Sequence, residues 1–387
     1  MDKFSLEAIF FRCKQAQIEG RYITQSHLFK VYKSLGIFDQ KIILGYSVNQ
    51  KSIEGFKFGN GKTKILIWSQ MHGNESTTTK SLVDFLAFLV EDSLASKSIL
   101  NRFSFFIIPM LNPDGAELYT RENANGIDLN RDFLNLSQPE SNILIEVFHS
   151  FQPHYCLNLH DQRSIYGVGK KMKSATVSFL SPAFNEERDI NETRLKAMNV
   201  IINMKKALSD FIPNQIGRYD DTFNRNCVGD TFQSLGVPTV LFEAGHFPDD
   251  YQREKTRFFI FVALLSGITS INENDIVSNI NAYYLKIPQN NPCFFDIIYR
   301  NVKISYENSN LITNFAIQYS EELSSNVWMQ KAKIVSIGDL RNFKGHVEID
   351  AENKLFNTTE GNFPFISQKA DFYLGKNTKV VNGLIIS

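Results

Sequence analysis

The chain has 387 residues, with 41 Lys and Arg against 41 Asp and Glu, so its formal net charge is zero. A balanced chain lacks the overall charge bias that marks proteins binding nucleic acid or an anionic membrane, so neither is expected as a partner. The length suits one large domain with a smaller one, or two comparable domains, and is sufficient to bury a substantial core.

The four cysteines, Cys13, Cys156, Cys227 and Cys293, are scattered without paired spacing. This pattern argues against a disulfide framework and against a thiolate zinc site. The N-terminal residues lack the long apolar run of a signal peptide, and no run reaches the roughly 18 to 20 apolar residues of a membrane helix. We therefore expect a cytoplasmic protein with reduced thiols.

The first ninety residues predict helices, then strands, then another helix. Apolar residues at helical spacings make residues 1–35 helical, and 41–48 and 51–58 have the pattern of two strands joined by a short turn. A third, apolar strand covers 64–68, and a helix with a buried stripe of leucine and phenylalanine runs over about 77–91.

The middle of the chain continues this alternation. Residues 102–110 form a strand apolar enough to be buried on both faces, and the strand ends at the turn signal 112–115. The irregular stretch 119–133 carries many polar and charged residues, which suits the wall of a site better than a core. A helix over 139–151 and a short core strand over 155–159 follow.

A long helix over about 186–211, an apolar strand at 239–242 and a helix over about 249–265 complete the pattern. Helices between successive strands predict an α/β fold with a mixed, largely parallel sheet covered by helices on both faces. Several of these strands end in polar or ionisable clusters. Since ligands of open α/β sheets bind outside the carboxyl ends of the strands, we expect the site along that edge.

The character of the sequence changes after about Asn272, where short β-type runs alternate with turn residues. We therefore divide the chain into an α/β domain over 1–280, which begins with a helical segment over 1–40, and a small all-β domain over 281–387. The β-type runs are 296–299, 314–319, 333–337, 346–349 and 380–386.

His72 and Glu75 stand three residues apart, directly after the strand at 64–68. On a turn that leads into a helix, this spacing puts an imidazole and a carboxylate on the same side, able to bind one cation. A surface histidine and glutamate beside a glycine turn would give the same local pattern, so the pair needs support from elsewhere in the chain.

Support comes from His160 and Glu243, which follow the strands at 155–159 and 239–242. A catalytic zinc takes three protein ligands and keeps one position open, and two histidines with one glutamate are a known ligand set, here supplied by His72, Glu75 and His160. Hydrolysis also needs a general base beside the water, and Glu243 is the natural candidate.

The polar stretch at 119–133 supplies cations for the same reaction. Hydrolysis of an amide builds negative charge on the carbonyl oxygen, and a substrate with a free carboxylate calls for a planar donor to bind it. Arg121 and Arg131 are available for these two tasks, with Asn130 beside the second arginine.

Together these motifs resemble, in order and approximate spacing, the M14 zinc carboxypeptidases, over roughly residues 40–265. The motifs that carry the resemblance are His72-Gly73-Asn74-Glu75, Asn112-Pro113-Asp114-Gly115, Gly126-Ile127-Asp128-Leu129-Asn130-Arg131, Leu159-His160 and Phe242-Glu243.

The resemblance implies one Zn²⁺ per chain, bound by His72, Glu75 and His160, with Glu243 as the general base. It implies that Arg121 stabilises the oxyanion, an assignment that rests on its Thr-Arg-x-Asn-Ala-Asn-Gly context. The substrate would be a peptide with a free C-terminal carboxylate.

The remaining implied roles concern substrate recognition and ligand orientation. Asn130 and Arg131 would hold the substrate carboxylate, and Asp128 would orient His72. Tyr219 lies near the place of the family's mobile substrate-binding tyrosine. Asp230, beside a glycine, falls in the region that selects the substrate's terminal side chain, where the sequence indicates no preference.

Three functions therefore stay open at this stage. The first is a zinc metallocarboxypeptidase, favoured by the motifs at 112–115 and 123–126. The second is a zinc amidohydrolase acting on N-acyl amino acids, similar to the aspartoacylase and succinylglutamate desuccinylase group, which shares the zinc site, the Asp-Leu-Asn-Arg element and a C-terminal β domain. The third is a binding module whose site has lost activity, although every group that the chemistry needs is present.

Overall fold

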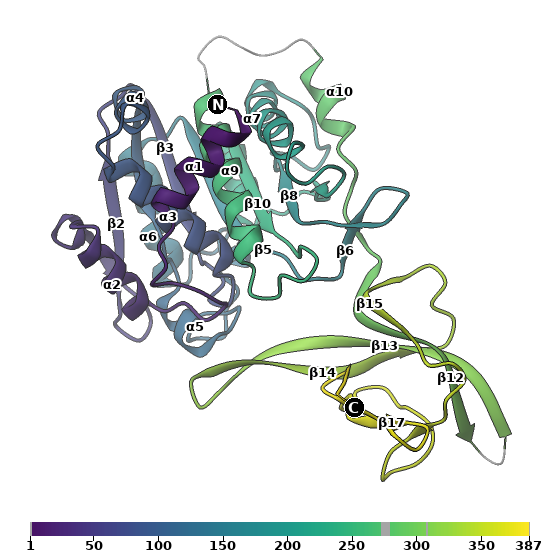
Figure 1. Ribbon diagram of the computed structural model, residues 1–387. Coiled ribbons are helices and arrows are strands. Elements are labelled where there is room, and N and C mark those ends of the chain that lie inside the picture. The colour runs from purple at the N-terminus through teal and green to yellow at the C-terminus, as the bar shows by residue number, and fades with distance from the viewer. Residues whose placement is uncertain (1, 272–278, 307–308, 387) are drawn as a thin grey trace. The chain divides into compact units, whose positions relative to one another are not determined.

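The computed structural model describes residues 2–271, 279–306 and 309–386, which fall into two compact units (Figure 1). The larger unit takes in Met1–Gln162 and Ala175–Asn290, and the smaller one takes in Arg163–Ser174 and Asn291–Ser387. None of the described helices is long and apolar enough to cross a membrane.

A mixed sheet forms the centre of the larger unit, and its described strands run in the order β1-β2-β4-β3-β5-β10-β8-β9. The neighbours β4, β3, β5 and β10 are parallel, as are β8 and β9, whereas β1, β2 and β8 each join by an antiparallel pairing. This arrangement confirms the predicted mixed, largely parallel sheet. The strands are β1 (Ile42–Tyr46), β2 (Ser52–Phe58), β3 (Thr63–Ser69), β4 (Phe103–Ile108), β5 (Tyr155–Asp161), β8 (Val177–Leu180), β9 (Ile216–Arg218) and β10 (Thr239–Ala244).

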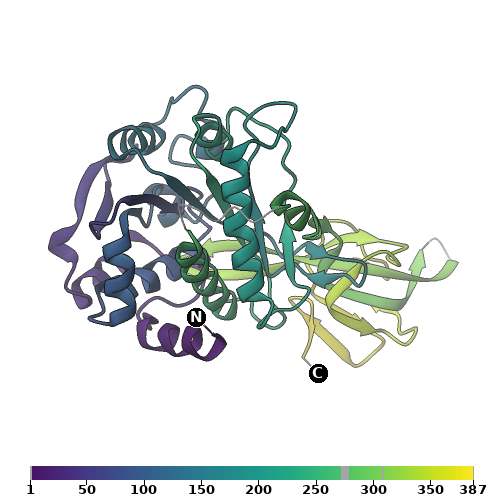
Figure 2. The same ribbon diagram turned by 90° about the horizontal axis from the view of Figure 1, so that it is seen from above.

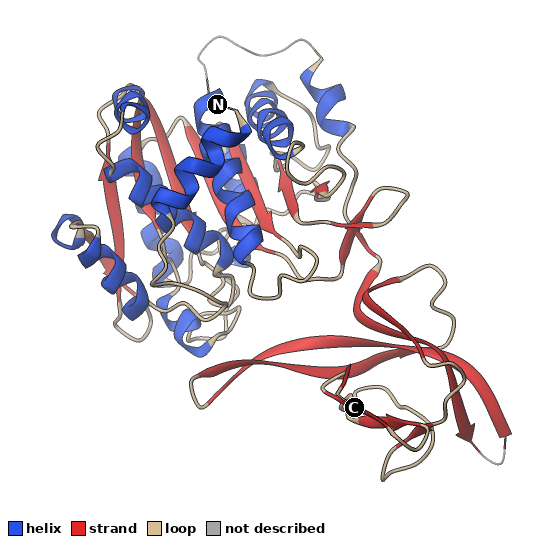
Figure 3. Cartoon of the chain, in the orientation of Figure 1, coloured by secondary structure: helices blue, strands red, loops and turns tan. Residues whose placement is uncertain are grey.

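Helices cover both faces of this sheet, as Figure 2 and Figure 3 show. Successive side chains of a strand point to opposite faces, and the central strand β3 buries both sets. Ile65 and Ile67 belong to the core under α3, α7 and α9, and Leu66 and Trp68 belong to the core under α6 and α8. The helices are α1 (Lys3–Cys13), α2 (Gln25–Ser34), α3 (Thr77–Val90), α4 (Leu94–Arg102), α5 (Pro113–Leu118), α6 (Pro139–Phe151), α7 (Glu192–Leu208), α8 (Val228–Ser234), α9 (Glu254–Ser270) and α10 (Ile280–Leu285), with short 3-10 turns η1 (Phe38–Gln40) and η2 (Leu129–Arg131).

Two helical predictions were too long. Residues 1–35 form two helices, α1 and α2, and the segment 14–24 between them is not helical. Gly20 within that segment has φ +75°, in the left-handed region that breaks a helix. The long helix predicted over 186–211 begins only at Glu192, where the Asn191 side chain accepts a hydrogen bond from the amide of Arg194 and caps the helix.

The segment 14–24 is held by a fully buried ion pair between Arg257 of α9 and Asp84 of α3, which are joined by two hydrogen bonds of 2.6 Å. The same guanidinium donates to the carbonyls of Ile18 (2.6 Å) and Gln15 (3.0 Å), and the amide of Gln15 donates to Asp84 (2.8 Å). This network fixes the N-terminal segment against α3 and α9.

The smaller unit is built of strands in its described residues, which confirms the predicted all-β character of the C-terminal part. One four-stranded sheet has the order β14-β13-β12-β15, and a second four-stranded sheet, with shorter strands, has the order β16-β17-β18-β19. These strands are β12 (Phe294–Tyr306), β13 (Ser309–Ser324), β14 (Val327–Ile337), β15 (Lys344–Asp350), β16 (Phe356–Asn357), β17 (Phe372–Leu374), β18 (Thr378–Val381) and β19 (Leu384–Ile385).

A short segment from the middle of the chain also belongs to this unit. Residues 163–174 carry β6 (Tyr166–Val168) and β7 (Lys173–Ser174), and β6 pairs with β11 (Asn291–Pro292). The sequence-based division at 280/281 did not separate this segment from the α/β domain. Its strands have only two or three residues, too few for a periodic pattern.

The buried network around Asp84 makes a prediction for stability. Asp84→Ala leaves the Arg257 guanidinium buried without its carboxylate, so the free energy of unfolding should fall by about 3 to 5 kcal/mol. Urea unfolding followed by circular dichroism measures this change. The matched control is Arg12→Ala, which breaks the exposed pair with Glu91 and should cost less than about 1 kcal/mol. Equal losses for the two variants would contradict the role given to the buried pair.

Candidate metal centre

The turn at residues 70–76, called the ligand turn below, connects β3 to α3 and carries His72 and Glu75. The turn packs closely against α5: a Cβ on Gly73 would lie 1.9 Å from the carbonyl carbon of Gly115, so only glycine fits there. Glu75 closes the turn by donating its amide to the carbonyl of His72 (3.1 Å). The glycine between the two residues therefore lets the turn approach α5 while both side chains face the sheet edge.

His160 lies on β5, in direct register with Glu243 on the neighbouring parallel strand β10. Because β3 and β5 are also parallel, with Ser69 opposite Leu159, the ligand turn begins at the same edge of the sheet. The strand order alone thus brings together four residues from three distant parts of the sequence.

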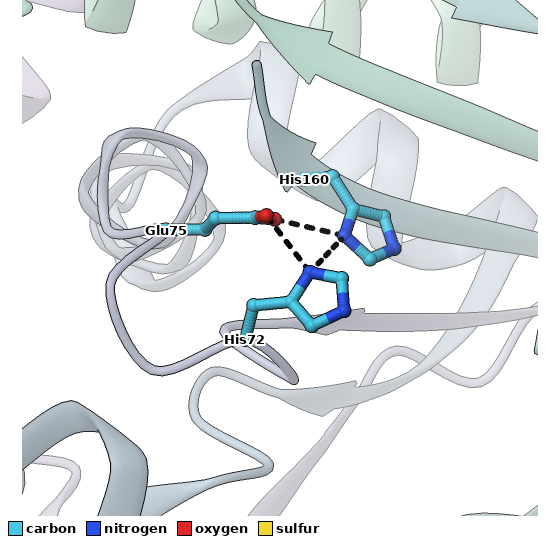
Figure 4. Close-up of side chains that lie close together, drawn as sticks. All are labelled: His72, Glu75 and His160. Carbon is cyan, nitrogen blue, oxygen red and sulfur yellow. Dashed lines mark hydrogen bonds and ion pairs between the residues drawn. The ribbon is translucent and has the colours of Figure 1, made fainter. Parts of the chain in front are cut away.

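The side chains of His72, Glu75 and His160 converge on one point (Figure 4). The two Nδ1 atoms are 3.2 Å apart, and each lies 2.8 Å from one carboxylate oxygen of Glu75. All three residues are buried, and their ligand atoms lie within 4.8 Å of one another. No other group of three such residues is present in the described part of the chain.

The donor set fits zinc. Two ligand atoms at roughly 2.1 Å from a zinc ion in tetrahedral geometry lie about 3.4 Å apart, close to the Nδ1–Nδ1 distance found here. His72 makes a hydrogen bond of 2.9 Å through Nε2 to Asp128, which leaves its Nδ1 facing the centre. Burial, together with the charges of His72 and Arg121, lowers the pKa of His160 despite the opposing effect of Glu75, which favours the neutral imidazole that binds a metal.

Two carboxylates at the centre have lowered pKa values. Burial alone would raise the pKa of Glu75, but His72 and His160 together hold it well below the usual range. Burial is likewise outweighed at Asp128, whose pKa is lowered by its hydrogen bond to His72 and by the charge of Arg121. Both carboxylates are therefore ionised at neutral pH.

Arg121 lies beside the ligand atoms and is partly exposed. Its guanidinium donates to Asp128 (3.0 Å) and to Glu75 (3.2 Å), and Nη1 lies 3.1 Å from Nδ1 of His72. Asn112 positions this loop, because its amide donates to the carbonyls of Met71 and Glu122, at 3.2 Å each. The Asn112 side chain thus ties the residue before His72 to the residue after Arg121.

Glu243 has a carboxylate whose Oε2 atom is buried without a hydrogen-bond partner among the described residues. Burial raises its pKa well above the usual range, and the charges of Glu75 and Asp161 raise it further. Among the described residues no protein group hydrogen-bonds to this Oε2 atom, so it is available to a water or a substrate.

Asn130 and Arg131 lie at the 3-10 turn η2, beside the start of α8. The side-chain oxygen of Asn130 accepts a hydrogen bond from the amide of Val228 (3.1 Å). Arg131 is exposed, and its Nη1 lies 2.7 Å from the carbonyl of Asn130 and 3.2 Å from Sγ of Cys227. The guanidinium fork of Arg131 is therefore accessible to a ligand, whereas the Asn130 oxygen is engaged in fixing α8.

The other two residues predicted to bind substrate lie in different places. Asp230 is in the first turn of α8 and only 7% exposed, and burial raises its pKa to about 7. Tyr219 follows β9 and donates its amide to the carbonyl of Phe179 (3.0 Å). The structure thus puts Asp230 on the helix that Asn130 caps, and Tyr219 past the end of the outermost strand of the sheet.

Sequence reasoning missed Asp161 and Arg21, which form a buried ion pair of 2.7 Å behind the centre. The amide of Asp161 donates to Oε2 of Glu75 (3.1 Å). Its position directly after His160 was the one available signal. No sequence pattern pointed to Arg21, because it lies within residues 1–35, which the sequence predicted to be helical.

Comparisons with known proteins point to one family and one fold. Residues 37–193 match the family described as zinc carboxypeptidase, Peptidase_M14. Carboxypeptidase 2 of Trichophyton rubrum is 30% identical over 110 residues, which are 28% of this chain and 20% of that protein. The chain therefore spans about a fifth of the length of this curated relative.

Among solved structures, a metallo-carboxypeptidase from Burkholderia cenocepacia superimposes with a TM-score of 0.51 and 18% identity, over 64% of this chain and 69% of that chain. A metallo-carboxypeptidase from Pseudomonas aeruginosa, solved in complex with (2-guanidinoethylmercapto)succinic acid, gives a TM-score of 0.51 and 14% identity, over 64% of this chain and 68% of that chain. At these identities the likeness establishes a shared fold.

The converging side chains make a prediction for metal binding. His160→Ala removes one of three ligand atoms, so the variant should lose most of the zinc that the wild-type chain binds. Elemental analysis after zinc loading and dialysis measures the bound metal. His149→Ala, at an exposed position of α6, is the matched control and should keep full occupancy. Full occupancy in the His160 variant would show that the centre is not the zinc site.

Proposed function

We propose, from the match of residues 37–193 to the M14 zinc carboxypeptidase family and from the geometry of the metal centre, that this chain is a zinc-dependent metallocarboxypeptidase. It would bind one zinc ion and hydrolyse the C-terminal peptide bond of a peptide. The observation that carries the proposal is the convergence of His72, Glu75 and His160 at one edge of the sheet, with Glu243 beside them on β10.

In this proposal, bound zinc supplies Lewis-acid chemistry, which polarises a carbonyl and makes a water easier to deprotonate. Glu243 takes the proton of the attacking water at its unpartnered Oε2 and later gives a proton to the leaving amine. The raised pKa of Glu243 suits the second step, because the protonated carboxyl is stable in this site until it gives its proton to the leaving amine.

The remaining residues would bind and orient the substrate. Arg121, with its guanidinium beside the ligand atoms, would donate to the oxyanion that forms at the carbonyl. Arg131 would bind the terminal carboxylate through its exposed fork, with Asn130 beside it. Asp128 would hold His72 in the orientation that keeps Nδ1 toward the metal.

The substrate-selecting roles of Asp230 and Tyr219 also remain proposals. Asp230 is buried on α8, two residues after Val228, whose amide donates to Asn130, and this place suits a pocket beside the carboxylate-binding arginine. Tyr219 would need to come to the substrate from the end of β9. The N-acyl amino acid hydrolase, the alternative with the same zinc site, is separated from the peptidase by a parallel screen of peptides and N-acyl amino acids.

A first prediction tests the base. Glu243→Gln keeps the shape of the side chain but cannot take a proton, so kcat should fall by at least about 100-fold while zinc stays bound. Steady-state kinetics on a good peptide substrate and elemental analysis of the same sample measure both quantities. Glu146→Gln, at an exposed site on α6, is the matched control. Turnover near the wild-type value would mean that the base lies elsewhere.

A second prediction tests the carboxylate site with one peptide prepared as the free acid and as the C-terminal amide. Losing a charged hydrogen-bond partner costs about 2 to 5 kcal/mol, so the wild type should cleave the amide with a kcat/KM lower by roughly 30-fold or more. Arg131→Ala should lower kcat/KM for the free acid by a similar factor, mainly through KM, and should have little effect on the amide.

The comparison of the two peptides also defines the outcomes that would contradict the proposal. Equal cleavage of free acid and amide by the wild-type chain would exclude the carboxypeptidase proposal and leave a zinc hydrolase of another kind. A large difference in the wild type that persists in the Arg131 variant would instead move the carboxylate site to another residue.

A further inference from the structure

Residues 21–23 lie against the ligand turn and outside the residues 37–193 that match the family. Ser76 donates its hydroxyl to the carbonyl of Arg21 (2.6 Å). The side-chain amide of Gln70 donates both to the carbonyl of Ile23 (3.0 Å) and to the carbonyl of Gly73 within the turn (2.9 Å). The two ends of the ligand turn are thus fastened to the same short N-terminal segment.

The side chain of Arg21 adds a third attachment. Its Nη1 donates to Oγ1 of Thr77, the first residue of α3, at 2.6 Å and to Oδ2 of Asp161 at 2.7 Å. Arg21 is 6% exposed, and the side chain of Asp161 is 2% exposed. A buried guanidinium therefore connects the helix that follows Glu75 to the strand that carries His160.

Asp161 is the residue through which this attachment reaches the centre. Its carboxylate accepts hydrogen bonds from the amides of Thr77 (2.9 Å) and Thr78 (3.1 Å). Both amides are at the start of α3, where the helix itself offers them no acceptor. Its own amide donates to Oε2 of Glu75 (3.1 Å). The position of Asp161 hence fixes both the start of α3 and one carboxylate oxygen of a candidate ligand.

Charge makes Arg21 more than a packing residue. Asp161 lies next to both of the other acids: its amide donates to Glu75, and its strand pairs with the strand that carries Glu243. Burying an ionised carboxylate is costly unless it is paired, and Asp161 is paired by Arg21 and by the positive end of α3. Without Arg21, Asp161 would be driven toward solvent, and its amide and His160 would move with it.

We infer that Arg21 is a positioning residue for the zinc centre, which acts through Asp161 and the ligand turn to hold Glu75 and His160 in the geometry that binds the metal. The inference rests on the proposed zinc function. It extends the metal centre to an N-terminal segment that a catalytic domain defined by the family match alone would leave out.

The test measures zinc affinity, which does not depend on peptidase activity. Arg21→Ala should raise the Kd for zinc, measured by competition with a chromophoric chelator, by about 10- to 100-fold. Arg21→Lys keeps a buried cation with several donors and should recover most of that affinity. Arg12→Ala, which removes an exposed arginine of α1 that pairs with Glu91, is the matched control and should leave the Kd unchanged.

Two further measurements separate positioning from general loss of stability. Co²⁺ bound in place of zinc has visible absorption bands that report ligand geometry, and these should shift in the alanine variant and return in the lysine variant. In a double-mutant cycle, Arg21→Ala should change the Kd by less than about 3-fold once Asp161→Asn is already present, because the ion pair is then gone and only the hydrogen bond from Arg21 to Thr77 is left to lose.

The outcomes are distinguishable. An unchanged Kd and Co²⁺ spectrum in Arg21→Ala would overturn the inference, as would a loss of affinity that lysine fails to recover and that is equal with or without Asp161→Asn. Failure of the wild-type chain to bind zinc at all would instead overturn the proposed function on which the inference rests.

Discussion

The site depends on the register in which the parallel strands β3, β5 and β10 pair, because this register aligns their carboxyl ends. Ser69 stands opposite Leu159, and His160 stands opposite Glu243, so all three strands end at one edge of the sheet. A shift of one residue in any of these pairings would turn the terminal side chain to the other face. The two apolar cores prevent such a shift, because each strand buries alternate residues under different helices.

The second requirement is electrostatic. The edge of the sheet gathers the carboxylates of Glu75, Asp128, Asp161 and Glu243 in a buried region. Arg121 pairs with Glu75 and Asp128, and Arg21 pairs with Asp161, whereas one oxygen of Glu243 has no partner within the described part of the chain. The fold therefore pairs three of the four carboxylates with arginines and leaves one oxygen of Glu243, the proposed base, available to a water or a substrate.

Much of this was accessible from the sequence because it follows from local patterns. Apolar strands with polar ends predicted the central sheet, and the ordered motifs predicted the resemblance to the M14 family, which the match over 37–193 confirms. The strands β8 and β9 have too few residues for a periodic signal. The first amide of α8, that of Val228, donates a hydrogen bond to the side chain of Asn130, which is distant in sequence. Arg21 was beyond reach for the same reason, since its partners become neighbours only when β5 and α3 meet.

The path of the chain between its two units has a consequence for modularity. The backbone leaves the α/β unit at Gln162, two residues after His160, returns at Ala175, and leaves again at Asn290. The strand β6 belongs to the first of these two segments of the smaller unit, and its partner β11 belongs to the second, which begins at Asn291. The two units are therefore interleaved rather than joined end to end, so a single cut in the chain cannot separate them into intact cassettes. Any recombination that exchanged the β unit would also have to replace residues 163–174, which begin three residues after the candidate ligand His160. The two units are therefore expected to evolve as a pair.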